Sequence, residues 1–196
     1  MKKVLISIKP KWVAEILNHR KTLEIRKTAP KDLPCEVYIY CTQGKDILLM
    51  IEDYDYGSMT YYAPKPALIE KPTRKASKDE VDLYGYYKRF KDTEHEWKLN
   101  GKVVAKFTLK GVEIVEICES EDCVDPRMAL FYGGNEEGSV VKACLTDGQI
   151  ADYLGYGHTG YAWEISDLVI FEKPKELKDF GVKRSPQSWC YCEVDE

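Results

Sequence analysis

The most informative segment of this 196-residue chain is Asn18-His19-Arg20-Lys21-Thr22-Leu23-Glu24-Ile25-Arg26-Lys27. It carries four cationic side chains and one carboxylate within a pattern that otherwise predicts a β-strand. Alternation along this strand places Leu23 and Ile25 on one face and Thr22, Glu24 and Arg26 on the other. A hydroxyl, a carboxylate and a guanidinium in one row suit a polar or phosphorylated ligand, so we predict a binding site here.

Length and composition favour one elaborated domain covering residues 1–196. A chain of this size with 44% hydrophobic residues can bury a substantial core. The net charge of −4 argues against a surface that is basic throughout. However, residues 1–31 hold nine Lys or Arg against two acids, whereas residues 113–155 hold ten acids against two basic residues. A local basic cleft is therefore compatible with the acidic average.

Several common classes of site and location are not indicated. The chain has no signal-peptide pattern and no apolar run near the roughly 20 residues that a membrane helix needs. We therefore expect a cytoplasmic protein without a membrane partner. The seven cysteines lack zinc-ribbon spacing, so free structural thiols are favoured over a metal or redox role. No P-loop or dinucleotide fingerprint occurs, and we expect no cofactor.

The hydrophobic periodicity predicts an α+β fold. The expected strands are 4–8, 22–26, 36–41, 101–118 with a turn or bulge at Lys110-Gly111, 161–171 and 188–194, and the expected helices are 10–17, 78–95 and 146–154. Residues 43–77 are interrupted by Gly and Pro and contain a tyrosine cluster. Together with the following helix they suggest a long insertion at about 43–98. The order of elements favours a small mixed β-barrel with flanking helices over a doubly wound sheet.

The charged segment resembles the signature of the ASCH family, Gly-x-Lys-x-x-Glu-x-Arg, which lies on a PUA-like β-barrel. Lys21, Glu24 and Arg26 match this signature, while His19 stands at the Gly position. The resemblance extends to residues 103–107, 160–165 and 183–191. It implies a cleft between the barrel and its flanking helices, which in some members is suggested to bind RNA or nucleotides. The function it implies here is an RNA or modified-nucleoside binding module.

One branch of small bacterial members resembles this chain in the opening motif and hydrolyses the amide of acetylated cytidine. That branch uses the signature Lys, a Thr three residues later and a Glu on a later strand. Here Lys21 matches, but Glu24 occupies the Thr position and the later strand reads Ala105-Lys106-Phe107. The mechanism is therefore not carried over intact. A hydrolase acting on RNA or an acylated nucleoside, with Lys21 as base and Thr22 or water as nucleophile, stays open.

Each residue of the charged row also has a purely structural interpretation. Arg26 could hold a phosphate through its planar fork, with Glu24 orienting the fork or accepting from a base amine. Alternatively, Glu24 and Arg26 form an ion pair that only closes the mouth of the barrel. Lys21 could contact a phosphate, act as a base, or be solvated.

Further ligand contacts are expected around Lys21, Glu24 and Arg26. Lys9 and Lys11 flank Pro10 at the start of the first helix, whose free N–H groups could help to bind an anion. Gln187 and Tyr161 complete the expected set, with Tyr161 as a stacking surface for a base. Trp163 could also stack, although such a residue is more typical of a core. A third class, a protein-interaction adaptor, would use the acidic region 113–155 or the tyrosine-rich insertion.

Overall fold

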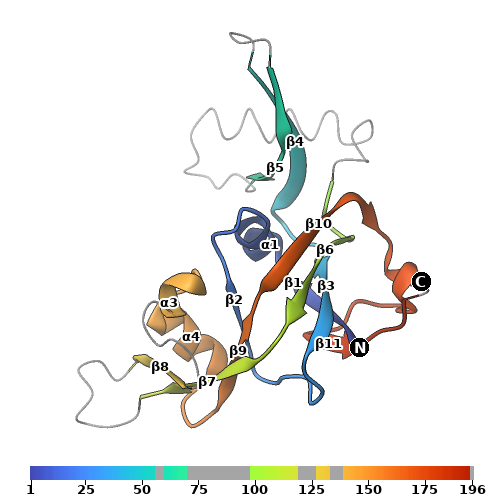
Figure 1. Ribbon diagram of the computed structural model, residues 1–196. Coiled ribbons are helices and arrows are strands. Elements are labelled where there is room, and N and C mark those ends of the chain that lie inside the picture. Colours follow the sequence, from blue (N-terminus) through green and yellow to red (C-terminus); the bar gives the residue numbers. More distant parts are fainter. Residues whose placement is uncertain (56–59, 70–97, 119–126, 133–138, 195–196) are drawn as a thin grey trace.

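The computed structural model describes residues 1–55, 60–69, 98–118, 127–132 and 139–194. Its strands are β1 (Lys3–Ile8), β2 (Leu23–Arg26), β3 (Cys35–Cys41), β4 (Ile47–Asp55), β5 (Thr60–Ile69), β6 (Val103–Leu109), β7 (Val112–Ile117), β8 (Ala129–Tyr132), β9 (Gly160–Glu164), β10 (Ser166–Lys175) and β11 (Trp189–Tyr191). Its helices are α1 (Pro10–Leu17), α3 (Ser139–Lys142), α4 (Asp147–Leu154) and the 3-10 helix η1 (Leu177–Phe180). This mixture confirms the α+β class (Figure 1).

The strands form three sheets. One has the order β10-β6-β3-β1-β11, the second β2-β9-β7-β8, and the third is the β4-β5 pair. The strands β1 and β3 run parallel, whereas the other paired strands of the described sheets run antiparallel. The sequence predicts a small mixed β-barrel; the mixed α+β fold is present, but the described strands do not close into a barrel. The reason is that two long β patterns of the sequence each break in the middle, and the halves join different sheets: β6 and β7 separate at Lys110-Gly111, and β9 and β10 at Ile165.

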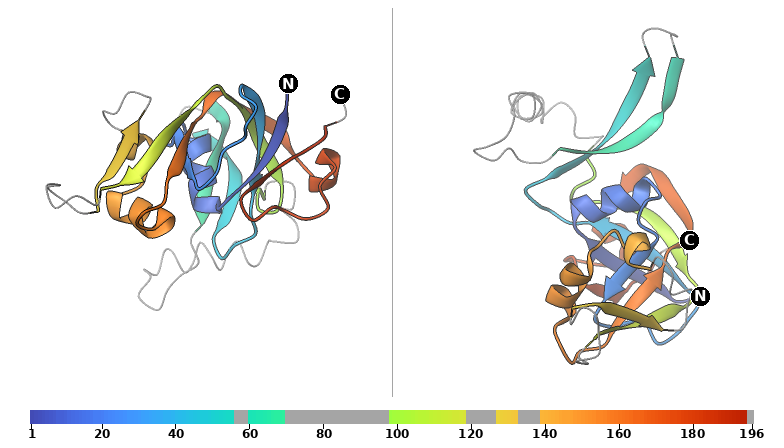
Figure 2. Two further views of the ribbon diagram at one scale, coloured as in Figure 1. Left: turned by 90° about the horizontal axis from the view of Figure 1, so that it is seen from below. Right: turned by 90° about the vertical axis from the view of Figure 1, so that its left-hand side faces the viewer.

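Hydrophobic alternation explains how the sheets pack. Val4, Ile6 and Ile8 of β1 lie in a core cluster that includes the apolar face of α1. Leu23 and Ile25 of β2 lie in a second cluster with residues of α4. A third cluster lies on the other side of β1 and β3 and includes Phe180 of η1. Figure 2 shows α3 and α4 beside the four-stranded sheet, and α1 on the side of the β4–β5 hairpin. The strand β2 therefore contributes its apolar face to one core and presents its polar face elsewhere.

The end of α1 explains a deviation from the family signature. Pro10 opens the helix, where its fixed φ and missing N–H are tolerated. Asn18 caps the other end, and its side-chain amide donates to the Ala14 carbonyl at 2.9 Å. His19 then adopts a left-handed conformation with φ of 57°, which glycine adopts most easily. The signature glycine at this position is thus explained by the positive φ that the backbone adopts here. His19 adopts the same positive φ at a conformational cost.

Residues 43–69 contain regular structure that the sequence pattern did not predict. Figure 2 shows the β4–β5 hairpin extending away from the two larger sheets. The strand β5 contains Pro64 and Pro66, and proline normally argues against a central strand. In this sheet the described residues pair β5 with β4 alone, which leaves β5 an edge where proline is tolerated. The side-chain amide of Asn18 donates to the Pro66 carbonyl at 3.3 Å and ties the hairpin to α1. The predicted helix 78–95 lies outside the described residues.

The described cysteines mostly meet the expectation of free thiols. Cys35, Cys41, Cys144, Cys190 and Cys192 are free. Cys118 is the exception, because it is disulfide-bonded. Burial raises the pKa of Cys35 to about 11 and that of Cys41 to about 12, so these thiols are poor nucleophiles. Within the described residues, no helix is long and apolar enough to cross a membrane.

Candidate functional site

The polar face of β2 is positioned by its pairing with β9. Glu24 lies opposite Trp163 and Arg26 lies opposite Tyr161 in this antiparallel pair. Directly opposite residues project from the same face of a sheet. These four side chains therefore share one face, while Leu23 and Ile25 project from the other into their own core cluster. The polar face is directed toward the core cluster that contains Trp163.

Lys21, Glu24 and Arg26 come together in one group, which we call the ion network. The Lys21 ammonium lies 3.3 Å from Glu24 Oε2, and Arg26 Nη2 lies 2.9 Å from Glu24 Oε1. One carboxylate thus bridges two cations, and the network carries a formal charge of +1. The contact between Glu24 and Arg26 was common to both sequence-based interpretations, so contact alone does not choose between them.

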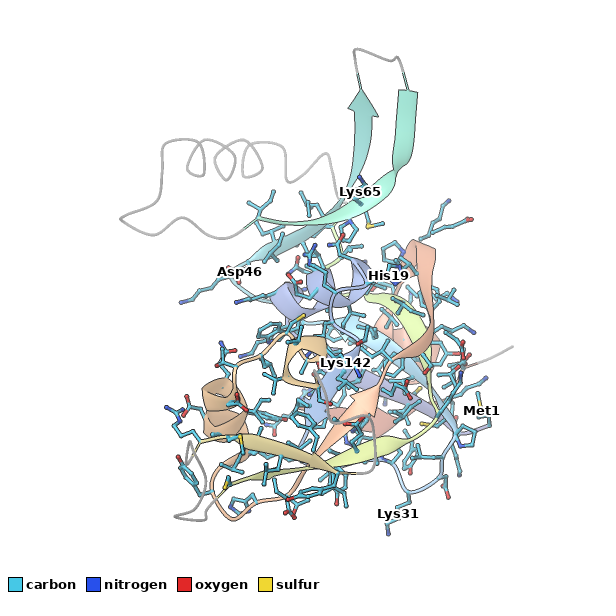
Figure 3. The ribbon with its side chains drawn as sticks, turned by 60° about the vertical axis from the view of Figure 1, so that its left-hand side comes forward. Met1, His19, Lys31, Asp46, Lys65 and Lys142 are labelled. Atoms are coloured by element: carbon cyan, nitrogen blue, oxygen red, sulfur yellow. The ribbon has the colours of Figure 1, made fainter. Side chains whose placement is uncertain are left out.

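Acceptors from three separate segments complete the ion network. The Lys21 ammonium donates to the Ala143 carbonyl at 2.5 Å, directly after α3. Arg26 Nη2 donates to the Ser7 carbonyl of β1 at 2.7 Å, and Nη1 donates to Ser188 Oγ at 3.4 Å. The network therefore joins β1, β2, the end of α3 and the segment that precedes β11. Figure 3 shows the neighbouring Lys142 near the centre of the molecule, where these segments meet.

The ion network is nearly enclosed. Lys21 is 2% exposed, Glu24 7% and Arg26 8%. Its remaining contact with solvent is through Glu24 and Arg26, because the Lys21 side chain is almost entirely covered. At this depth an ion pair is stable only when its hydrogen bonds are well satisfied.

Among the described residues, three buried polar side-chain atoms have no hydrogen-bond partner. Two are N–H donors, Arg26 Nε and the indole Nε1 of Trp163, and the third is the hydroxyl oxygen of Ser7. A buried donor without a partner costs about 1–3 kcal/mol, and such groups are uncommon in native structures. Both donors belong to residues on one face of the β2–β9 pair. The arrangement can therefore donate two hydrogen bonds to an acceptor that supplies oxygen or nitrogen lone pairs.

Aromatic rings flank the ion network. The Lys21 ammonium lies 5.4 Å from the centre of the Trp12 ring, and the Lys11 ammonium lies 4.9 Å from the same ring. Both distances are suitable for cation–π attraction. Trp163 is fully buried and its ring meets Trp189 edge-on at 5.8 Å, so it has the expected core position. Trp12 was not among the site residues expected from the sequence, because only the folded position of α1 brings its ring to Lys21.

The other predicted contact residues lie at the margin. Lys9, Lys11, Thr22 and Gln187 are exposed, and Tyr161 is half-buried opposite Arg26. Sequence reasoning did not name Ser188, although it follows Gln187 directly and reaches Arg26. Its only signal was its place within the third stretch of family resemblance. The structure thus brings Lys21, Glu24 and Arg26 into contact and leaves the remaining polar residues around them.

Two titratable groups border the network. A hydrogen bond from Arg20 lowers the pKa of the Glu15 carboxyl, and Arg20 Nε lies 2.5 Å from Glu15 Oε2. Burial raises the pKa of the Cys144 thiol, although the charges of Lys21 and Arg20 partly oppose this. Cys144 directly follows Ala143, whose carbonyl accepts from Lys21. Because burial raises its pKa, the Cys144 thiol favours its protonated form. Neither group supplies a base near Lys21 of the kind that a nucleophilic mechanism needs.

The mixed α+β fold is similar to that of solved ASCH structures. The crystal structure of ASCH from Zymomonas mobilis matches with a TM-score of 0.52 and 14% sequence identity, over 97% of this chain and 87% of that chain. A Tyr-to-Phe variant of the same protein matches with the same score and identity, over 97% and 90%. No family model and no curated protein matches the chain. The comparisons therefore support an ASCH-like fold.

Proposed function

We propose that this chain binds RNA or a modified nucleoside, with the ion network at the floor of a basic cleft. The observation that carries the proposal is the pair of unpartnered donors, Arg26 Nε and Trp163 Nε1, next to a buried network of charge +1. Phosphate oxygens and base carbonyls are the acceptors that such donors suit. The ASCH-like fold is consistent with this class of ligand.

Basic side chains accompany the segments that meet at the network. Lys9 is exposed and follows β1, whose Ser7 carbonyl binds Arg26. Lys142 is half-buried and precedes Ala143, which binds Lys21. Lys183 and Arg184 are exposed and precede Ser188. A phosphate backbone approaching this region would meet positive charge from several directions, which favours nucleic acid over a neutral ligand.

Both N–H donors that lack a partner among the described residues have a role in this proposal. Arg26 Nε and Trp163 Nε1 would donate to the ligand, while Glu24 holds the guanidinium in position. The half-buried rings of Trp12 and Tyr161 would offer stacking surfaces, and a stacked base contributes about 1–3 kcal/mol. Lys21 acts here as a charged donor. Its ammonium already donates to the Ala143 carbonyl and contacts the Glu24 carboxylate.

Exposed residues at the margin give a test that leaves the fold intact. We expect purified protein to bind a short single-stranded RNA, with an affinity that falls as salt increases. Lys9→Ala and Lys11→Ala should each weaken binding and make the salt slope shallower by about 1. Lys173→Ala is the matched control, because Lys173 is an exposed lysine on β10. Binding that is absent at low salt, or equally weakened in the control, would overturn the proposal.

The same preparation separates binding from catalysis. Incubation with short RNAs and acylated nucleosides should leave both unchanged, because binding alone requires no turnover. Product formed by the wild type but not by Lys21→Met would instead assign a hydrolase. In that case Thr22 is not an obvious nucleophile. It is exposed, and its backbone bonds to Lys142 and Ile165 fix only the main chain. Recovery of a protein partner without RNA would favour the adaptor alternative.

A further inference from the structure

A concave site lies at the opposite end of β1 from the ion network. It has a volume of about 470 Å³, which is within the usual range for small-molecule sites. We call it the β1–β11 pocket, and its lining residues are Lys2, Lys3, Phe180, Gly181, Val182, Tyr191, Cys192 and Glu193. Figure 1 shows the chain start beside β11, where the pocket is formed. Lys3 and Ser7 are four residues apart on β1, or about 13 Å, so the two sites are separate.

The lining of the β1–β11 pocket carries net positive charge. Among the described lining residues, Lys2 and Lys3 contribute two cations against the carboxylate of Glu193, which gives +1. Lys3 is half-buried, and its ammonium donates to the Val194 carbonyl at 3.1 Å. An ammonium has three donors, and this bond uses one of them. The bond also fixes the position of the charge at the pocket wall.

The carboxylate nearest to Lys3 behind the pocket is already engaged. Glu36 lies beside Lys3 in the parallel β1–β3 pair. Its Oε1 lies 2.6 Å from the Lys106 ammonium, and its other oxygen accepts from the Tyr38 hydroxyl. Lys106 thus balances the charge of Glu36. Lys3 adds only a weaker favourable charge interaction with Glu36, because Lys106 and Tyr38 make the direct contacts.

Aromatic and apolar groups supply the rest of the surface. Phe180 is fully buried and contacts the Tyr38 ring at 4.8 Å between centres, which makes a rigid floor. The Tyr191 ring is 48% exposed, and the Lys2 ammonium lies 5.9 Å from its centre. A flat ligand lying on Tyr191 would therefore place its edge near a cation. This combination selects a ring joined to an anionic group.

We propose that the β1–β11 pocket binds a small aromatic anion, a planar ring carrying a carboxylate or a phosphate. The ring packs on Tyr191 and over the apolar floor, and the anionic group accepts from Lys2 and Lys3. The site shares no lining residue with the ion network, so its test does not depend on RNA binding.

Titration of the ¹⁵N-labelled full chain, followed by amide NMR shifts, tests this proposal. Benzoate and phenyl phosphate should give saturable shifts at Lys2, Lys3 and Tyr191, while the neutral ring of benzyl alcohol should bind at least about fivefold more weakly. Lys2→Gln and Tyr191→Leu change exposed side chains and should each weaken benzoate binding by about fivefold. Lys173→Gln is the matched control on β10.

Three outcomes would overturn the proposal. They are an absence of saturable shifts with either anion, equal binding of benzyl alcohol, and unchanged benzoate affinity in both pocket variants. Inorganic phosphate separates the two contributions, because it should bind more weakly than phenyl phosphate if the ring contact matters. Equal affinity for the two would show that charge alone is recognised, against the proposed role of Tyr191.

Discussion

Glu24 is the residue on which the ion network depends, because one carboxylate serves two buried cations. The alternation of Leu23, Glu24, Ile25 and Arg26 was enough to predict that the polar side chains share a face. The contacts that enclose them were not predictable. The carbonyls of Ser7 and Ala143 belong to any residue type, and only the folded backbone brings them to Arg26 and Lys21.

Replacing Glu24 by Gln should strongly destabilise the protein. The change leaves Lys21 and Arg26 buried without their shared counter-charge, which costs on the order of 3–5 kcal/mol. Urea unfolding followed by circular dichroism measures the loss. Glu15→Gln is the control, because it removes a carboxylate that pairs with the exposed Arg20, and it should have a much smaller effect. Similar small losses in the two variants would contradict a desolvated network.

His19 gives a second test at the scale of one residue. Because its φ is positive, His19→Gly should keep or raise the free energy of unfolding, by up to about 1 kcal/mol. His19→Val should lower it by about 1–2 kcal/mol, since a β-branched residue is strained in this conformation. Thermal unfolding of both variants makes the comparison. A glycine variant as unstable as the valine variant would show that the histidine side chain, and not the backbone, matters here.

At the scale of elements, short strands with clear alternation and the capped helix 147–154 were predictable from sequence. Thr146 and Gln149 form a capping box at the start of α4. The strand β5 was not predictable, because Pro64 and Pro66 argue against a strand unless its free edge is known. The sheets that the two halves of the 101–118 pattern join were also not predictable, since a turn signal does not determine which sheet the next strand enters.

The contact between β3 and β6 predicts a pH dependence. Burial alone would raise the pKa of the Glu36 carboxyl, but hydrogen bonds from Lys106 and Tyr38 outweigh it and hold the pKa below the usual 4.5. A depressed pKa in the folded state means that Glu36 contributes stability above its unfolded pKa. That contribution is lost as the pH falls through the folded value.

Glu36→Gln should therefore remove part of the acid sensitivity. We expect the wild type to lose more stability than the variant between about pH 6 and pH 3, measured by urea unfolding at each pH. Lys106→Met should also lose less stability than the wild type over this pH range, because it removes the cation that lowers the pKa of Glu36. Parallel stability curves for the wild type and Glu36→Gln would contradict the assignment.

At the scale of the whole molecule, the α+β class follows from the order of patterns, and the ASCH-like fold follows from the signature around Lys21. The small mixed barrel was predicted only in part: the described strands do not close, because the bends at Lys110-Gly111 and Ile165 direct the chain into separate sheets. Those same bends bring β9 against β2, so that Trp163 and Tyr161 face Glu24 and Arg26. The arrangement that departs from the predicted barrel is thus also the one that builds the polar face.

The central claim is that a ligand reaches the polar face of β2. The most direct measurement is ¹H–¹⁵N NMR of side-chain N–H groups during titration with a short single-stranded RNA and, separately, with nucleosides. We predict that the Arg26 Nε and Trp163 Nε1 signals shift as the ligand saturates, because both donors gain an acceptor. The chemical shift of Arg20 Nε should not change, because that donor is already hydrogen-bonded to Glu15. Saturable binding that leaves Arg26 and Trp163 unmoved, or no binding of either ligand, would contradict the account.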